Sequence, residues 1–357
     1  MIPIAQPLLG ADEYEAVLAV LTSGLMAQGE QVARFEKRFA ELSQTEEAVA
    51  VSSGTAALHL ALLAHDIGPG DEVITSPFSF AATANTILLV GAKPVFVDIE
   101  ADTYNLDPAL VERAITPRTK AIMPVHLYGN PADMGRLMPL AQAHGLVMIE
   151  DACQAHLASI DGKTVGSFGT GCFSFYPTKN MTTGEGGIVT TNDPEIAERV
   201  RLLRSHGQKQ RYLHVAIGYN LRMTDIQGAI GNAQIKKLEG FNERRIQNAQ
   251  YLNERLSEYV QTPVVRPGHR HVYHQYTIRA RGDRDQWVKT LGERGIGTGI
   301  HYPRPIHKQP FYIEQGFDMS LPVAEAAAAE VICLPVHPAL TNDDLERVAQ
   351  EVIALCR

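Results

Sequence analysis

An alternation of short apolar runs with longer amphipathic stretches occupies residues 47–151 and limits the folds open to this chain more than any other feature. The apolar runs have the length of buried strands, and the stretches between them have helical periodicity. Strands joined by helices run in one direction, so the pattern predicts a parallel or mostly parallel sheet with helices on both faces. The predicted strands are 47–53, 72–75, 94–97, 120–127 and 146–149, and the predicted helices are 55–64, 81–90, 107–115 (with Asp107 as its cap) and 134–144.

The second half of the chain has a different pattern. A long amphipathic stretch at 224–259 predicts one helix that leaves the large domain. Because 357 residues exceed the usual size of one core, we place a boundary near residue 240. The large domain is then 1–240 and a small α+β C-terminal domain is 241–357, with the N-terminal segment docking beside the small one. The further elements predicted after residue 170 are strands at 172–176, 187–191 and 271–280 and helices at 194–205, 284–294, 323–331 and 342–355.

Composition excludes several classes of protein. A net charge of -8 argues against a general nucleic-acid binder, although a local basic pocket for an anionic substrate stays open. The four cysteines show no CxxC spacing, so no zinc or iron–sulfur site is expected, and few unclustered cysteines fit a reducing cytoplasm. The chain shows neither a signal peptide nor an apolar run of about 18 residues, so we expect a cytoplasmic protein without a membrane span.

Ligands of open α/β sheets bind at the carboxyl ends of the strands, and a first candidate site follows the strand at 47–53. The segment Ser52-Ser53-Gly54-Thr55 precedes a predicted helix. Glycine permits close backbone approach, the hydroxyls donate hydrogen bonds, and a helix N-terminus carries positive partial charge. The segment therefore suits a phosphate, although Ser and Thr are also ordinary helix caps.

Three further candidates follow other predicted strands. Asp151 comes after the apolar run at 146–149, where a carboxylate could bind a metal, cap a helix or pair with a cation. Lys179 lies in FYPTKNMTTGEGG, between an aromatic strand and a glycine-rich turn, where its amine could form a Schiff base with an aldehyde cofactor or could simply be solvated. Phe80 follows the strand in EVITSPFS and could stack on a cofactor ring or belong to the core.

Taken together, the motifs resemble the DegT/DnrJ/EryC1/StrS sugar aminotransferases, and the likeness covers nearly the whole chain. The matching stretches are SSGTAALHLAL, GDEVITSPFSFAATANTILLVGAKPVFVDIE, EDACQAH, GCFSFYPTKNMTTGEGGIVTTND, GYNLRMTDIQGAIGNAQIKKLE, HYPRPIHKQPFY and LPVHPALT. This family has the aspartate-aminotransferase fold (fold type I) and uses pyridoxal 5′-phosphate (PLP). The resemblance therefore implies a large α/β domain with a mostly parallel sheet and a smaller α+β C-terminal domain.

The resemblance also implies roles for individual residues. Lys179 would form the Schiff base with PLP, and Asp151 would pair with the pyridine nitrogen and keep the ring an electron sink. The other cofactor contacts would be Gly54, Thr55 and Ser174 at the phosphate, Phe80 on the ring, Gln154 at the phenolic oxygen and Asn220 at the phosphate of the neighbouring subunit, which requires a homodimer with shared sites. The resemblance also places His301, Tyr302 and His307 in the cleft for a sugar nucleotide.

The reaction that the resemblance implies is a ping-pong transamination from an amino acid, with L-glutamate as the expected donor, to a keto sugar nucleotide. The product would be an amino sugar for surface polysaccharide or a glycosylated metabolite. Lysine at position 179 favours nitrogen transfer over the oxygen elimination of relatives that carry histidine there. Leu157-Ala158 departs from the Gly-Ala usual after this motif but removes no group that the chemistry requires. The alternatives are a PLP enzyme of this fold, aminotransferase or lyase, acting on a non-sugar cyclic ketone, and a PLP-binding sensor without catalysis.

Overall fold

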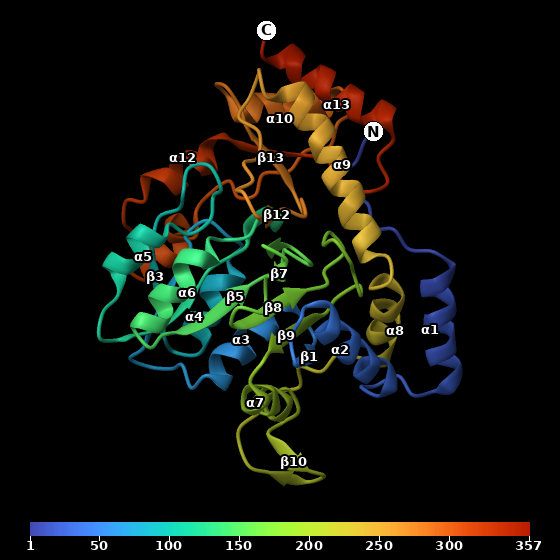
Figure 1. Cartoon of the computed structure of the whole chain (residues 1–357), viewed down its shortest axis with the longest axis vertical. Helices are drawn as coiled ribbons and strands as arrows, with labels where there is room; N and C mark the ends of the chain where they lie inside the picture. Colours follow the sequence, from blue (N-terminus) through green and yellow to red (C-terminus); the bar gives the residue numbers. More distant parts are fainter.

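The computed structural model describes all residues, 1–357, and its centre is a seven-stranded sheet (Figure 1). The strand order is β1-β9-β8-β5-β4-β2-β3. β9 runs antiparallel to both of its neighbours and all other pairs are parallel, as the alternation in the sequence predicts. The strands are β1 (Glu47–Val51), β2 (Glu72–Thr75), β3 (Lys93–Phe96), β4 (Thr119–Met123), β5 (Val147–Asp151), β8 (Thr170–Ser174) and β9 (Gly187–Thr191).

Helices cover both faces of this sheet, because the strands alternate apolar side chains toward two separate cores. On one face, α3 (Gly54–Ala64), α4 (Ala82–Leu89) and α7 (Pro194–Arg204) pack against Val49, Val73 and Ala121. The other face is covered by α2 (Glu30–Leu42), α5 (Pro108–Ala114) and α6 (Met134–Ala143). The sheet is therefore buried on both faces. Only the two edges at which the strands begin and end, the amino edge and the carboxyl edge, are free to build a site.

The stretch at 224–259 is two helices rather than the single helix that we expected. α8 (Asp225–Gln234) is capped by Thr224, whose side chain forms a capping box with Gln227, and α9 (Leu238–Leu256) follows after a short turn. α1 (Ala11–Ser23) and α2 both pack against α8, and neither of these two helices was expected. The amphipathic periodicity continues across the turn, so the sequence pattern does not reveal that the helix is interrupted. The tertiary packing of α8 determines where the first helix ends.

The C-terminal part forms a second core around α9. This core joins α9 to β13 (Tyr276–Arg279), β14 (Val331–Leu334), α10 (Arg284–Glu293) and α13 (Asn342–Leu355). Ile2 belongs to the same core and pairs with Ile296, and Figure 1 shows the N-terminus beside α9 and α13.

The remaining elements are the helices α11 (Pro310–Glu314) and α12 (Pro322–Glu330), the 3-10 helices Leu127–Gly129 and Ile306–Lys308, and the short strands β6 (Ser159–Ile160), β7 (Lys163–Thr164), β10 (Gln208–Gln210), β11 (Leu213–His214) and β12 (His269–Arg270).

None of these helices combines the length and the hydropathy needed to cross a membrane. The strands β10 and β11 form a hairpin that projects away from the body of the molecule below α7 (Figure 1).

Candidate active site

The carboxyl ends of β1, β5 and β8 open into one cavity of about 560 Å³. Most of the side chains that the sequence singled out line it, although they come from segments far apart in the chain. The predicted residues in the cavity wall are Gly54, Thr55, Phe80, Asp151, Gln154, Ser174, Lys179, His301 and Tyr302.

One end of the cavity is the N-terminus of α3. Ser53 caps this helix by accepting a hydrogen bond from the backbone N–H of Ala56 at 3.1 Å. A Cβ at Gly54 would meet the Cβ of Ser174 at 2.6 Å and the sulfur of Cys153 at 3.0 Å, so only glycine fits at this position. The N-terminus of α3, with the hydroxyls of Thr55 and Ser174 in the same wall, suits an anionic group such as a phosphate.

Asp151 is the last residue of β5 and carries a buried carboxylate in the cavity wall. Its Oδ2 accepts a hydrogen bond from the Thr83 hydroxyl at 2.7 Å, and its Oδ1 accepts one from the backbone N–H of Cys153 at 3.3 Å. Neither lysine nor arginine bonds to it. A carboxylate held in this way keeps unused acceptor capacity for a cationic group of a ligand.

Lys179 lies in the loop after β8 and forms no salt bridge within the chain. Burial lowers the pKa of its amine, which Cys153 and Asp151 offset in part. The same amine adds to the effect of burial on His301, whose pKa falls to about 4, so that the imidazole is neutral at pH 7. A lysine with a lowered pKa and no carboxylate partner is suited to act as a nucleophile and as a base.

Tyr302, His301 and Gln154 close the opposite side of the cavity. Gln154 accepts a hydrogen bond from the backbone N–H of Tyr128 at 2.8 Å and donates one to the Tyr302 hydroxyl at 3.2 Å. The ring of Tyr302 lies 6.3 Å from that of Phe80, centre to centre. Phe80 itself is 61% exposed, so its ring face is free to stack on a planar ligand.

Two of the expected residues lie elsewhere. His307 is fully buried outside this cavity, where its Nε2 pairs with Glu325 at 3.2 Å and its ring packs against Phe96. The expected contact of His307 with the substrate is therefore not seen in the cavity of its own chain. Asn220 is exposed and also outside the cavity of its own chain, with its side-chain oxygen accepting from Arg222 at 3.1 Å.

The cavity also contains side chains that sequence reasoning did not single out. Thr83 follows the PFSF motif at the start of α4, and Tyr176 comes three residues before Lys179, so their positions near known motifs were an available signal. Glu185, His274 and Gln275 also line the wall. No sequence signal pointed to His274, because only the packing of the C-terminal part brings it to the site.

The residues of the cavity fit pyridoxal phosphate. The glycine-lined start of α3 suits its phosphate, the exposed Phe80 face suits its ring, the Asp151 carboxylate suits a protonated pyridine nitrogen, and the Lys179 amine suits its aldehyde. The structure has no cluster of His, Cys, Asp or Glu arranged to hold a metal ion.

Comparison with known proteins gives the same family over almost the entire length. Residues 7–353 match the model of the DegT/DnrJ/EryC1/StrS aminotransferase family. A UDP-N-acetyl-3-dehydro-alpha-D-glucosamine 3-aminotransferase from Acidithiobacillus ferrooxidans is 45% identical over 333 residues, which cover 92% of this chain and 90% of that protein.

Solved structures agree with this result. DesV of S. venezuelae, in complex with a ketimine intermediate, has a TM-score of 0.94 at 42% identity and covers 97% of this chain and 94% of its own. The PLP form of a sugar aminotransferase described as putative, Spr1654 from Streptococcus pneumoniae, has a TM-score of 0.94 at 30% identity, with 99% and 98% coverage. The chain belongs to the DegT/DnrJ/EryC1/StrS aminotransferase family, with the fold-type-I architecture and pyridoxal phosphate as its cofactor.

Proposed function

We propose that this aminotransferase moves an amino group from an amino acid, with L-glutamate as the donor, to a keto sugar attached to a nucleoside diphosphate. The observation that carries the proposal is the meeting of Lys179, Asp151 and the α3 N-terminus in one cavity. The 45% identity to a nucleotide-sugar 3-aminotransferase supports the class of acceptor. The amino sugar formed would serve a surface polysaccharide or a glycosylated metabolite.

In this proposal the first task of the chain is to hold the cofactor. Gly54 and Thr55 bind the phosphate from the helix N-terminus, and Ser174 adds a hydroxyl. Phe80 stacks on the ring, and Gln154 contacts the phenolic oxygen. Bound pyridoxal phosphate supplies an aldehyde that takes up the amino group and a ring that accepts electrons.

Asp151 and Lys179 then control two protons. The Asp151 carboxylate holds the proton at the pyridine nitrogen, which requires the unused acceptor capacity seen in its hydrogen bonds. The Lys179 amine takes the proton from the Cα of the amino donor and later returns a proton on the acceptor side, as a general base and then as a general acid. Its lowered pKa supports this role, because it increases the share of the amine that is free of a proton at neutral pH.

The sugar end of the site is assigned to His301 and Tyr302. His301 is a neutral imidazole and Tyr302 carries a phenol whose pKa burial raises, so both present hydrogen-bonding groups without charge to sugar hydroxyls. Lys179 is the only lysine or arginine in the wall. Apart from Lys179, one chain therefore offers no positively charged side chain to the diphosphate of an anionic acceptor.

We further propose a homodimer with shared sites, in which Asn220 reaches the phosphate of the neighbouring subunit's cofactor. Asn220 is exposed and follows the β10–β11 hairpin in the chain, which supports a contact outside its own chain. Apolar side chains on α1, on this hairpin and in the segments that directly follow them are also left uncovered, as at interfaces. The most exposed of them are Tyr14 at 66%, Leu18 at 64%, Leu25 at 75%, Tyr212 at 79% and Ile217 at 89%.

Two expectations accompany the proposal. A domain boundary near residue 240 falls at the start of α9, where the chain enters the second core. A cytoplasmic location is supported by the four cysteines, all of which are free thiols.

A panel of keto-sugar nucleotides with L-glutamate as donor tests the proposed function. We expect 2-oxoglutarate in the first half-reaction and a single amino-sugar nucleotide in the second, with C3-keto and C4-keto acceptors as separate members of the panel. Turnover of a non-sugar cyclic ketone alone would contradict the acceptor class. The absence of a half-reaction with any amino acid would favour a PLP-binding protein without catalysis.

A further inference from the structure

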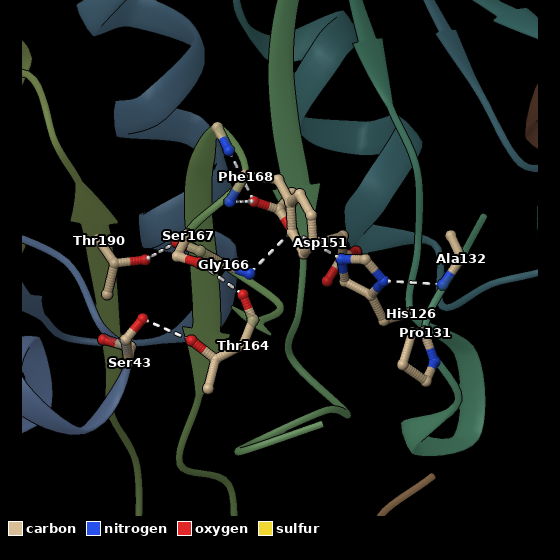
Figure 2. A network of polar contacts seen from close by, with 12 residues as sticks. Ser43, His126, Pro131, Ala132, Asp151, Thr164, Gly166, Ser167, Phe168 and Thr190 are labelled. Carbon is tan, nitrogen blue, oxygen red and sulfur yellow. Dashed lines mark hydrogen bonds and ion pairs between the residues drawn. The ribbon is translucent and has the colours of Figure 1, made fainter. Parts of the chain in front are cut away.

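Glu150 precedes Asp151 on β5 and points away from the cavity, because neighbouring strand residues face opposite ways. Its side chain is fully buried. Oε1 accepts hydrogen bonds from the backbone N–H groups of Phe168 at 2.9 Å and Gly169 at 2.8 Å. Oε2 accepts from the N–H of Gly166 at 2.8 Å and pairs with Nε2 of His126 at 3.0 Å (Figure 2). All four donors converge on one carboxylate.

The protonation of His126 follows from its own partners. Its Nδ1 accepts a hydrogen bond from the backbone N–H of Ala132 at 3.0 Å, as Figure 2 shows, so Nδ1 carries no proton. The ring proton is therefore on Nε2 and is donated to Glu150. The His126–Glu150 contact is a hydrogen bond of fixed direction between a neutral imidazole and a carboxylate.

These contacts form a closed circuit with the backbone of Asp151. The N–H of Asp151 donates to the carbonyl of Pro124 at 2.9 Å, and the N–H of His126 donates to the carbonyl of Asp151 at 3.0 Å. The circuit runs from Asp151 to His126 through the backbone, from His126 to Glu150 through the side chains, and back to Asp151 along the chain. Movement of the end of β5 therefore stretches at least one of these bonds.

The loop that holds Glu150 is fixed as well. The carbonyl of Gly166 accepts from the Thr190 hydroxyl at 2.7 Å, which ties the loop to β9 (Figure 2). A Cβ at Gly169 would meet the carbonyl oxygen of Met148 at 2.3 Å, so glycine lets the loop lie directly against β5. Glu150 thus links β5 to a rigid support rather than to a mobile surface loop.

We propose that Glu150 and His126 are positioning residues, which hold the Asp151 carboxylate at the distance and angle that the pyridine nitrogen of the cofactor requires. Neither residue lines the cavity, so both act through Asp151. The inference rests on the role proposed above for Asp151. Catalysis is sensitive to such placement, because an error of about 1 Å at a reacting centre can lower the rate on the order of a hundredfold.

Glu150→Gln is the sharpest test, since it keeps the shape of the side chain. The amide NH₂ must replace one carboxylate oxygen, and either position faces two donors. We expect kcat to fall about tenfold to a hundredfold with KM little changed. A displaced Asp151 lets the pyridine nitrogen lose its proton, and without that positive charge the nitrogen joining Lys179 to the cofactor holds its own proton to higher pH. The visible absorbance band of the bound cofactor should therefore titrate at higher pH than in the wild type.

Glu72→Gln is the matched control. Glu72 is a buried glutamate of the same sheet at the opposite end of the parallel strands, where it accepts from Thr116 and Arg118. Both variants should lose stability in thermal unfolding of the cofactor-free protein, but only Glu150→Gln should move the absorbance titration. Asp151→Asn provides the reference shift, in the same direction and larger.

The outcomes distinguish the proposed role of Asp151 from the proposed role of Glu150. If Asp151→Asn leaves the titration unchanged, the role of Asp151 is contradicted, and the inference about Glu150 is contradicted with it. If Asp151→Asn shifts the titration but Glu150→Gln changes only stability, with wild-type kcat per bound cofactor, Glu150 is merely structural and the inference alone is overturned.

A second pair of variants covers the case in which Glu150→Gln does not fold. His126→Gln keeps a donor near the position of Nε2, whereas His126→Leu removes it. We expect the absorbance titration of His126→Gln to lie nearer to that of the wild type than that of His126→Leu. Equal titrations in both variants, matching the wild type, would overturn the inference.

Discussion

The charged side chains at the two ends of the parallel strands differ in whether they have a partner of opposite charge within the chain. At the amino edge, Glu72 is 3% exposed and is satisfied within the chain by the Thr116 hydroxyl at 2.6 Å and the Arg118 guanidinium at 2.7 Å. At the carboxyl edge, Asp151 has no cationic partner and Lys179 has no carboxylate. Buried charged groups are normally paired, so those left unpaired in a cavity indicate that a ligand completes them. The pairing of Glu72 at the amino edge stabilises the fold, and we infer that the unpaired groups at the carboxyl edge bind the cofactor.

Substitution of Lys179 should have the largest effect on this contrast. Lys179→Ala removes the nucleophile and the proton carrier, so we expect kcat to fall by a factor on the order of 10⁴–10⁶. Cofactor should remain bound without a covalent link, because the variant leaves the proposed phosphate contacts at α3 in place. Steady-state kinetics and the cofactor content after gel filtration measure the two effects. Lys120→Ala, at an exposed position of β4, is the control and should retain wild-type kcat.

Asp151→Asn should have the next largest effect. The amide cannot hold the pyridine nitrogen protonated, so kcat should fall by about 10²–10³, as with other preorganised electrostatic contacts. Cofactor affinity should change much less, because the phosphate and Lys179 contacts remain. Cofactor titration of the apoenzyme, beside kcat, provides the comparison. Near-normal turnover would remove Asp151 from the proposed role.

A mixing experiment asks whether the carboxyl edge is complete within one chain. Inactive Lys179→Ala and Asn220→Ala subunits are allowed to exchange. If sites are shared, each heterodimer has one site with both lesions and one with neither, so random pairing should restore about a quarter of wild-type activity. The experiment requires that Asn220→Ala alone is severely impaired. Absence of recovery despite proven exchange, or an active monomer at assay concentration, would contradict shared sites.

Glu72→Gln should affect stability and not catalysis. We expect a loss of about 1–3 kcal/mol in the free energy of unfolding, since the amide keeps only one of the two oxygens that accept from Thr116 and Arg118. The Thr116 hydrogen bond, followed by that of Arg118, lowers the pKa of Glu72 below 4.5. Its contribution to stability is therefore present above the unfolded pKa and is lost as the pH falls through the folded pKa. Urea unfolding from pH 7 down to pH 3 should show a weaker acid dependence in the variant, and kcat at pH 7 should equal that of the wild type.

Sequence reasoning predicted the seven strands of the central sheet and the helices α3 to α7, because these strands are apolar runs bounded by turn residues and these helices have clear periodicity. The sequence also placed Lys179, Asp151 and Gly54 after strands whose carboxyl ends must meet at one edge, and all three line one cavity. The break between α8 and α9 was missed because the amphipathic pattern continues through it.

Residues whose position depends on long-range packing could not be predicted. His307 has the polarity of a substrate contact, but its pairing with Glu325 and its packing on Phe96 are not visible in the sequence. The Glu150–His126 bond joins residues on neighbouring strands, and only the sheet topology brings them together. A pattern of residue types thus locates the edge of the sheet, and the fold decides which side chains enter the cavity.

Trapping of the covalent link is the most direct test of the active-site assignment. The purified protein loaded with pyridoxal phosphate should be yellow, and borohydride reduction followed by peptide mass spectrometry should locate the cofactor on Lys179. In Lys179→Ala, reduction should leave no cofactor attached to the chain after denaturation. Stoichiometric attachment at another lysine, or retention of the reduced adduct in Lys179→Ala, would place the reactive amine outside the cavity at the carboxyl edge and would contradict the assignment.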